Sequence, residues 1–378
     1  MHVVLAIDSL GSGGAQRQVV ELAAQLRRQP GVRCSVLVYQ ADDFYAPRLR
    51  ESGVALARIP KRLRVDPLLP WRIGRWLGQA GADVVHAFLL APCLWTLLAV
   101  RTLPRRRRPA LIAAERNCLI ATSPLLGALQ RLVYRRADAV TANAACAAGE
   151  IAAKLGVPEG RVHYLPNGID LERWDADARC APPFELDPGC FHLALVGGLR
   201  PQKAHHVLLD ALVRLGPERI AGWRVWCVGG RTAGERAAAS VEARIREAGL
   251  GAVVRLVPPL RNVAALMARL DALVLPSLFE GFPNVVLEAM ACRLPVVATP
   301  VGDVPNLVAD GESGLLVPAG DAGALARALD SLAALPPDER RRMGERGRAA
   351  AEARFSIEQV ALRHLALYRA VGGRESGA

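Results

Sequence analysis

The sequence predicts an α/β protein of two doubly wound domains, each a parallel sheet with helices on both faces. Short apolar runs alternate with longer helix-compatible segments along the chain, and this alternation is typical of βαβ units. At 378 residues the chain is long enough for two domains with separate cores. We therefore expect a ligand to bind in a cleft between the domains, at the carboxyl ends of the strands.

In the first half, a strand at residues 3–7 runs into a glycine-rich loop, and an amphipathic helix follows at residues 15–28. Further strands are expected at residues 34–39, 82–88, 110–114, 139–142 and 162–165. The loop contains Gly11, Gly13 and Gly14 and suits close approach of a phosphate. Gln16 replaces the last glycine of the dinucleotide fingerprint, so we reject NAD binding.

The second half repeats the pattern after residues 171–190, where Asp, Pro and Arg crowd and periodicity fails. We expect this segment to be a linker between domains at residues 1–170 and 191–355. Strands are expected at residues 191–196, 223–228, 253–257, 272–275 and 295–299, and helices at residues 204–215, 262–270, 322–334, 337–353 and 356–370.

Composition excludes several classes of protein. The eight cysteines include no CxxC pair, so neither a zinc site nor a disulfide framework is predicted, and reduced thiols in a cytoplasm fit best. The N-terminus has no basic leader, and Asp8 interrupts its apolar run, which argues against a signal peptide. The apolar stretch at residues 87–100 is shorter than the ~18 residues that a membrane span needs.

The net charge of +12 lies entirely in the first half. Residues 1–166 contain 23 basic and 11 acidic side chains, whereas the remainder contains 25 of each. The run Arg105 to Arg108 has no interleaved aromatic residues, so we expect no nucleic-acid partner. Basic, Trp and Leu residues share a predicted short amphipathic helix near residues 68–77. This pattern favours binding to an anionic membrane surface.

The most informative stretch is residues 276–290, predicted to be the end of a buried strand, a tight loop and a helix. Glu280 lies in the loop and Glu288 lies on the helix. Most Glu side chains are simply solvated, but a helix N-terminus after a parallel strand presents free N–H groups to a ligand. The position of Glu280 therefore favours a ligand-binding role.

The spacing Glu280-x7-Glu288, with Gly281-Phe282-Pro283-Asn284 inside it, resembles the signature of glycosyltransferase family 4. Those proteins are retaining nucleotide-sugar transferases of GT-B architecture, in which two Rossmann-like domains face a cleft. Two more segments extend the resemblance, Pro166-Asn167-Gly168-Ile169-Asp170 and residues 311–318. The resemblance implies that the first domain binds the acceptor and that residues 356–378 pack back on it.

The resemblance also implies a donor site for a UDP- or GDP-sugar, with Glu280 as a catalytic residue beside the sugar and Glu288 at the ribose. In the segment 197–203, Arg200 and Lys203 would bind the diphosphate, since Arg offers a fork and Lys a point charge. The implied donor-binding residues are Gly13, Gly14, Arg200, Lys203, Gly281, Phe282, Pro283, Asn284 and Glu288.

In the first domain, His86 is the candidate second catalytic residue, because the family often carries His at this strand end beneath the transferred sugar. Phe88 stands where a second His is common. Arg116 and Asn117, which follow the strand at residues 110–114, are candidate acceptor contacts. Asp303 and Asn306 depart from the Gly and Glu usual in the family, so the surroundings of the sugar are expected to differ.

The predicted function is retaining, metal-independent hexosyl transfer to a glycan or lipid-linked acceptor, without a cofactor. We expect a bacterial enzyme of cell-envelope polysaccharide synthesis, such as lipopolysaccharide or exopolysaccharide. It would be cytoplasmic and peripheral on the inner face of the plasma membrane. The alternatives are a nucleotide-sugar epimerase, a phosphorylase with pyridoxal phosphate on Lys203, and a non-catalytic nucleotide-sugar-binding protein.

Overall fold

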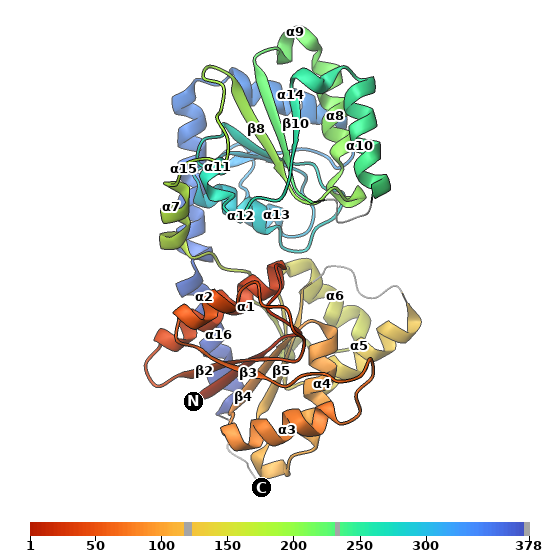
Figure 1. Ribbon diagram of the computed structural model, residues 1–378, viewed down its shortest axis with the longest axis vertical. Helices are drawn as coiled ribbons and strands as arrows, with labels where there is room; N and C mark the ends of the chain where they lie inside the picture. The colour runs from red at the N-terminus through yellow and green to blue at the C-terminus, as the bar shows by residue number, and fades with distance from the viewer. Residues whose placement is uncertain (117–122, 231–234, 374–378) are drawn as a thin grey trace. The chain divides into compact units, whose positions relative to one another are not determined.

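The structure is a computed structural model that describes residues 1–116, 123–230 and 235–373 (Figure 1). The chain divides into two compact units, here called unit 1 and unit 2. Unit 1 comprises Met1–Gly168 together with the C-terminal segment that begins at Ile357, and unit 2 comprises Ile169–Ser356. Each unit contains one parallel sheet with helices on both faces, which confirms the fold class expected from the sequence.

The segment expected to be a linker is part of unit 2. It contains helix α7 (Leu171–Ala178), in which Asp170 accepts a hydrogen bond from the Arg173 N–H at 3.1 Å and caps the N-terminus. Trp174 packs against the core of unit 2, and its indole N–H donates to Cys292 Sγ at 3.0 Å. The crowding of polar residues concealed a short helix that is anchored by one aromatic side chain.

Unit 1 has a seven-stranded sheet with the order β3-β2-β1-β4-β5-β6-β7. Its strands are β1 (His2–Ala6), β2 (Arg33–Val38), β3 (Ala55–Arg58), β4 (Val84–Phe88), β5 (Ala110–Glu115), β6 (Ala139–Ala142) and β7 (Val162–Tyr164). Its helices are α1 (Gly14–Arg28), α2 (Ala46–Glu51), α3 (Leu69–Ala80), α4 (Leu90–Arg101), α5 (Pro124–Arg136), α6 (Ala145–Leu155) and α16 (Ile357–Gly372), with 3-10 turns η1 (Arg105–Arg107) and η2 (Glu159–Arg161).

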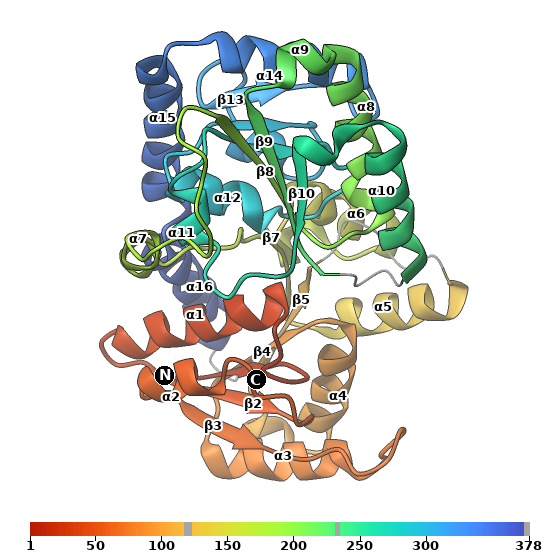
Figure 2. The same ribbon diagram turned by 45° about the horizontal axis from the view of Figure 1, so that its top comes forward.

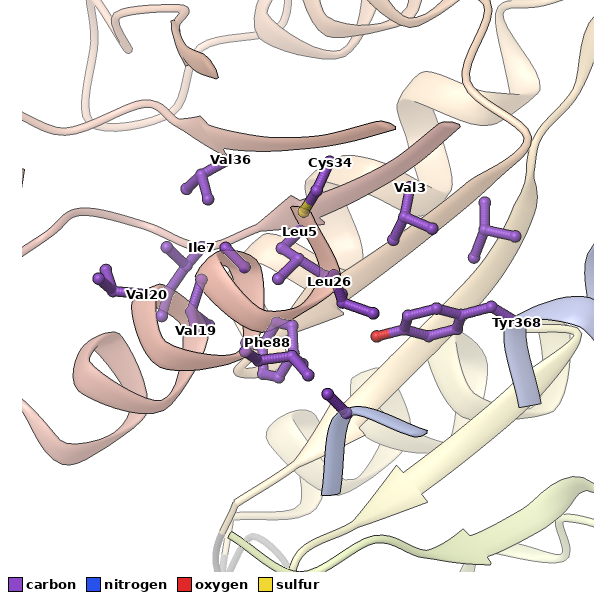
Figure 3. Close-up of a cluster of buried hydrophobic side chains, with 14 of the residues drawn as sticks. Val3, Leu5, Ile7, Val19, Val20, Leu26, Cys34, Val36, Phe88 and Tyr368 are labelled. Carbon is purple, nitrogen blue, oxygen red and sulfur yellow. The ribbon is translucent and has the colours of Figure 1, made fainter. Parts of the chain in front are cut away.

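Strand β1 shows why this sheet is covered on both sides. Val3 and Leu5 enter a core shared with α1 and α16, whereas Val4 and Ala6 enter a second core shared with α3, α4, α5 and α6. Alternate residues of a strand point to opposite faces, so a strand buried on both faces must be apolar throughout. Figure 3 shows the first core, with Tyr368 of α16 reaching towards Phe88 and Leu26.

Unit 2 has a six-stranded sheet with the order β10-β9-β8-β11-β12-β13, and Figure 2 shows β8, β9 and β10 side by side. Its strands are β8 (Phe191–Val196), β9 (Trp223–Val228), β10 (Val254–Val257), β11 (Ala272–Leu275), β12 (Val296–Ala298) and β13 (Gly314–Leu316). Its other helices are α8 (His205–Leu215), α9 (Pro217–Ile220), α10 (Glu235–Glu247), α11 (Ala264–Met267), α12 (Asn284–Ala291), α13 (Val304–Leu307), α14 (Ala322–Ala334) and α15 (Pro337–Phe355), with 3-10 turns η3 (Pro201–Lys203) and η4 (Leu250–Ala252).

Two further findings bear on the expectations from composition. Within the described ranges, no helix combines the length and apolarity that crossing a bilayer requires. Among the described residues, the free thiols are Cys34, Cys93, Cys180, Cys190, Cys227 and Cys292. Cys146 is disulfide-bonded. The expectation that all cysteines are reduced is therefore wrong at that position.

Candidate functional site

The loop after β11 contains Glu280, and unit 2 holds its side chain firmly. Ser277 is fully buried, and its hydroxyl donates to Glu280 Oε1 at 2.6 Å. Lys203 Nζ donates to the same oxygen at 2.7 Å and forms an ion pair with Glu280. The structure thus brings together two residues that lie far apart in the sequence, Lys203 of the loop after β8 and Glu280 of the loop after β11.

Glycines provide the space for this contact. A Cβ atom at Gly197 would lie 3.0 Å from Lys203 Cε, and one at Gly229 would lie 2.0 Å from the Gly197 carbonyl oxygen. These two glycines allow the ends of β8 and β9 to pack closely beneath the aliphatic part of the Lys203 side chain. Leu278 N–H also donates to the Gln202 carbonyl at 2.8 Å, which joins the two loops through their backbones.

The loop after β12 supports the Glu280 loop from its other side. Gly302 has φ of +57°, and a Cβ atom there would lie 2.4 Å from the carbonyl oxygens of both Glu280 and Gly281. Asp303 N–H donates to the Gly281 carbonyl at 2.9 Å. Asp303, which departs from the family pattern, is completely buried and accepts a hydrogen bond from Asn306 Nδ2 at 3.1 Å. This carboxylate is therefore held inside unit 2.

Helix α12 follows this loop, with Pro283 as the N-cap and Asn284 as the first helical residue. Phe282 is a core residue, with its ring centroid 6.0 Å from that of Phe355. Phe282 and Asn284 could therefore contribute backbone groups at this helix N-terminus. Glu288 is also largely buried, with an exposed fraction of 7%.

Arg200 lies at the start of the same loop as Lys203. It is exposed and occupies the N-cap of η3, where its N–H donates to the Gly198 carbonyl at 2.7 Å. Arg200 and Lys203 therefore lie on one short loop at the carboxyl edge of the unit 2 sheet. A forked cation and a point charge, the two kinds of side chain that bind phosphate groups, thus lie three residues apart on one loop.

In unit 1, the glycine loop leads into α1, with Gly13 as the N-cap and Gly14 as the first helical residue. Acidic side chains lie close to this loop. Asp8 accepts hydrogen bonds from Ser9 N–H at 2.8 Å and from Gln16 Nε2 at 3.1 Å. A Cβ atom at Gly11 would lie 2.4 Å from Asp42 Oδ2. The loop thus combines helix N–H groups, which favour anions, with carboxylates that oppose them.

His86 is a core residue of unit 1. It is completely buried in β4, with Nδ1 at 2.8 Å from the Tyr368 hydroxyl and Nε2 at 2.9 Å from Thr141 Oγ1. Burial, with smaller contributions from His364 and Arg116, holds the pKa of His86 well below 6.5, so the ring is neutral. This placement argues against contact between His86 and a sugar.

Arg116 lies directly after β5 and makes contacts within unit 1. Its Nη1 donates to Asn167 Oδ1 at 2.6 Å, and its guanidinium lies 4.7 Å from the ring centroid of Phe88. Burial lowers the pKa of Arg116 to about 10, opposed by the attraction of Tyr368 and Glu115. Asn117, the other candidate acceptor contact, lies outside the described residues.

The segment Pro166 to Asp170 has a structural role at each polar position. Asn167 binds Arg116, and Asp170 caps α7. The Gln18 side chain pairs with the backbone of Gly168, since Nε2 donates to its carbonyl at 2.8 Å and its N–H donates to Oε1 at 2.9 Å. The sequence identified this segment as a turn and did not reveal these partners.

No cluster of His, Cys, Asp or Glu suited to a metal ion occurs within the described ranges. The chain does contain an Asp-x-Asp triplet, Asp175-Ala176-Asp177 in α7. Asp175 accepts two hydrogen bonds from Arg348, at 2.7 and 2.8 Å, and Asp177 lies 3.9 Å from Arg173 Nε. The triplet therefore forms ion pairs in unit 2.

Sequence reasoning did not identify Ser277 as part of the site. Its only local signal is its position between a buried strand and Glu280, three residues away. A serine at such a strand end is common, and the hydrogen bond becomes visible only when the loop is folded.

Comparison with known proteins covers both halves of the chain. Residues 12–173 match the family model described as Glycosyltransferase Family 4, and residues 190–334 match the model described as Glycosyl transferases group 1. D-inositol 3-phosphate glycosyltransferase 2 of Catenulispora acidiphila is 37% identical over 57% of this chain and 52% of its own length. D-inositol 3-phosphate glycosyltransferase of Segniliparus rotundus is 31% identical over 75% of this chain and 65% of its own length. The matched segments thus span about half to two thirds of these relatives.

Solved structures share the fold over nearly the whole chain. Anabaena HepE, solved in complex with UDP, has a TM-score of 0.82 at 19% identity and covers 98% of this chain and 100% of its own. A glycosyltransferase from Rickettsia africae has a TM-score of 0.84 at 16% identity, covering 99% of both chains. Sucrose-phosphate synthase from Thermosynechococcus elongatus has a TM-score of 0.79 at 22% identity, covering 99% of this chain and 100% of its own.

Proposed function

Because the chain belongs to glycosyltransferase family 4, we propose that it is a retaining glycosyltransferase that takes a sugar from a nucleoside-diphosphate sugar. The observation that carries this proposal is the cluster of Lys203, Glu280 and Ser277 at the carboxyl edge of the unit 2 sheet. It combines a cation for a diphosphate with an oriented carboxylate for sugar hydroxyls. Ligands of open α/β sheets bind at this edge.

In the proposed reaction, the bond between the anomeric carbon and the diphosphate breaks as the acceptor hydroxyl attacks from the same face, and the hydroxyl proton passes to the departing diphosphate oxygen. Negative charge grows on the departing diphosphate, and Arg200 and Lys203 stabilise it. Glu280 accepts a hydrogen bond from the sugar, and the helix N-terminus at Phe282 and Asn284 donates to its hydroxyls. Glu288 binds the ribose. No metal and no cofactor enter this scheme.

UDP-sugars are the first donors to test, because HepE has been solved with UDP and with UDP-glucose. GDP-sugars remain the second choice. The D-inositol 3-phosphate glycosyltransferases among the relatives suggest an acceptor that carries a phosphate, and a lipid-linked glycan phosphate of the cell envelope meets the same requirement. Arg116, at the carboxyl edge of the unit 1 sheet, is the candidate contact for that acceptor.

A thermal-shift screen with UDP, GDP, UDP-glucose and GDP-mannose tests donor binding, because a ligand that binds only the folded state raises the melting temperature. Retention is tested by NMR of the first product formed, whose anomeric configuration should match that of the donor. Activity unchanged by EDTA is expected for a metal-independent enzyme. Failure of every nucleotide to stabilise the protein would contradict the proposal.

A surface of unit 1 supports a membrane-associated acceptor. Its apolar members are Leu63, Val65, Leu68 and Trp71, whose exposed fractions are 63, 72, 64 and 54%. Its basic members are Arg62, Arg64 and Arg75, which form no ion pair within the described ranges. We call these seven residues the basic apolar surface. Such a combination favours insertion at an anionic interface.

The two basic clusters of the first half lie at opposite ends of one helical layer. Residues 59–68 follow the carboxyl end of β3, whereas η1 (Arg105–Arg107) precedes the amino end of β5. Helix α3 lies between these two edges of the sheet, and its length corresponds to about 18 Å. We therefore restrict the proposed membrane contact to the basic apolar surface, which lies at the ligand-binding edge.

Flotation with vesicles tests this restriction. Binding to phosphatidylglycerol vesicles is expected at low salt, with little binding to phosphatidylcholine vesicles. Joint replacement of Arg62, Arg64 and Arg75 by Gln should abolish the binding, because each base near an anionic leaflet contributes about 1 kcal/mol. Replacement of Arg105 to Arg108 by Gln is the matched control and should leave the binding intact. Equal loss of vesicle binding in both variants would contradict the assignment of the membrane contact to the basic apolar surface.

A further inference from the structure

Ser277 has a single side-chain function in the described structure. Its hydroxyl is fully buried and donates to Glu280 Oε1 at 2.6 Å. Its own backbone is held in turn, because Thr299 Oγ1 donates to the Ser277 carbonyl at 2.5 Å. A hydroxyl fixed in this way cannot turn to water, so the contact with Glu280 is part of the folded loop.

The two donors to Glu280 converge on one oxygen. Ser277 Oγ and Lys203 Nζ both bind Oε1, at 2.6 and 2.7 Å. Within the described ranges, Oε2 has no hydrogen-bond partner, although only 9% of the Glu280 side chain is exposed. A carboxylate oxygen can accept more than one hydrogen bond, and the free one is the oxygen that remains for a substrate hydroxyl.

We propose that Ser277 is a positioning residue that keeps Glu280 oriented for the sugar while Lys203 binds the donor diphosphate. The inference rests on the proposed function, in which Glu280 contacts the sugar. The ammonium of Lys203 is a mobile point charge with three donors, and a diphosphate competes with Glu280 for it. Ser277 is neutral and fully buried, so its bond to Oε1 persists when the donor binds.

The backbone around Ser277 gives this arrangement its rigidity. Gly302 lies against the carbonyls of Glu280 and Gly281, and Asp303 N–H donates to the latter. The main chain of the loop is therefore fixed on both sides, and the remaining freedom of Glu280 lies in its own side-chain torsions. The bond from Ser277 restricts those torsions. A small displacement of the Glu280 carboxylate would reduce turnover, because catalysis depends on exact positioning.

A double-mutant cycle between Ser277 and Glu280 tests the inference. UDP-glucose, UDP-N-acetylglucosamine and GDP-mannose are screened for nucleotide release, and the donor that turns over is used. Ser277→Ala should lower kcat roughly tenfold and leave the donor KM within about twofold, as for loss of one hydrogen bond to a charged group. Ser277→Thr keeps the hydroxyl and should restore most of the turnover.

The second side of the cycle uses Glu280→Ala, measured in single turnovers with enzyme in excess. If Ser277 acts through Glu280, adding Ser277→Ala to this background should change the rate less than twofold. An equal loss in both backgrounds, or wild-type kcat for Ser277→Ala, would overturn the inference. Ser277→Cys, which is similar in size and a weaker donor, replaces Ser277→Ala if that variant does not fold and should lie between wild type and the expected tenfold loss.

The outcomes separate this inference from the proposed function. Absence of turnover with every donor, together with absence of nucleotide binding, contradicts the proposed function. Turnover that Glu280→Ala leaves unchanged contradicts the role of Glu280 and overturns the inference with it. Turnover that depends on Glu280 but not on Ser277 overturns the inference alone.

Discussion

The predicted site residues of the two units occupy different positions relative to the strand ends. In unit 2, Lys203 and Glu280 lie on loops beyond the last paired residues of β8 and β11, and they meet at 2.7 Å. In unit 1, His86 lies within β4, where it pairs with Leu5 and Ile112 of the adjacent strands. A side chain beyond the end of a strand can face a ligand, whereas one inside a doubly covered strand is part of a core. His86 lies two residues before the end of β4, whereas Glu280 lies five residues beyond the end of β11.

The largest expected effect concerns the buried side of the comparison. His86→Ala should lower the free energy of unfolding by about 3–4 kcal/mol. The substitution leaves a cavity and removes the hydrogen-bond partner of both the Tyr368 and the Thr141 hydroxyl. Chemical denaturation measures the loss. Turnover per folded molecule should stay within about twofold of wild type. A variant that is stable but inactive would show that His86 is catalytic after all and would break the comparison.

Glu280→Gln should lower turnover roughly a hundredfold, which corresponds to about 2.7 kcal/mol of transition-state stabilisation. The amide keeps the shape of the side chain but removes the negative charge that faces the developing positive charge on the sugar. Steady-state kinetics should show the loss in kcat, with donor affinity nearly unchanged. Ser313→Ala, in unit 2 but distant in sequence from the Glu280 loop, is a control that should keep kcat. Wild-type kcat for Glu280→Gln would leave this carboxylate with a structural role only.

Lys203→Ala should weaken binding of the nucleoside diphosphate roughly thirtyfold, or about 2 kcal/mol, because one charge-assisted contact to phosphate is lost. Calorimetry with UDP and GDP measures the change. Lys154→Ala is a matched control, since Lys154 is exposed and pairs with Glu150 in unit 1. Unchanged affinity for both nucleotides would show that Lys203 serves only as the partner of Glu280.

The smallest effect is a pH dependence of stability in unit 1. Burial lowers the pKa of His364 to about 4, whereas an exposed His has a pKa of about 6.5. The unfolded state therefore binds the proton more readily, so the contribution to stability is complete above pH 6.5 and is lost as the pH falls towards 4. At pH 5.5 the loss should be about 1.4 kcal/mol. His364→Gln should flatten this part of the profile, and an unchanged profile would contradict the burial of His364 as a neutral ring.

The sequence predicted those parts of the fold that local pattern determines. Strands β6, β8, β9 and β11 begin and end at the predicted residues, because each is a mostly apolar run bounded by turn signals. Strand β3 was missed, since it is an edge strand whose four residues are all partly exposed or exposed. An edge strand needs apolar residues on fewer sides, so its pattern is weak.

The candidate site was predictable where charge and motif coincide on a loop, as at Lys203 and Glu280. It was not predictable where the partner comes from elsewhere in the chain. The burial of His86 depends on Tyr368 of α16, which lies 282 positions further along the chain. The contact between Arg116 and Asn167 likewise joins two strand ends through space. Spacing in the sequence carries no information about such pairs.

The two ends of unit 2 lie next to each other, which bears on whether each unit can fold alone. Unit 2 is a single uninterrupted stretch, and its two ends are joined by a hydrogen bond from Ile169 N–H to the Phe355 carbonyl at 2.9 Å. On the unit 1 side, a Cβ atom at Gly168 would lie 3.0 Å from Ile357 Cα. Unit 2 is thus connected as an inserted domain, and neighbouring termini of this kind tolerate excision and circular permutation. A short graft from Gly168 to Ile357 should yield unit 1 as a free-standing protein, and residues 169–356 should fold independently.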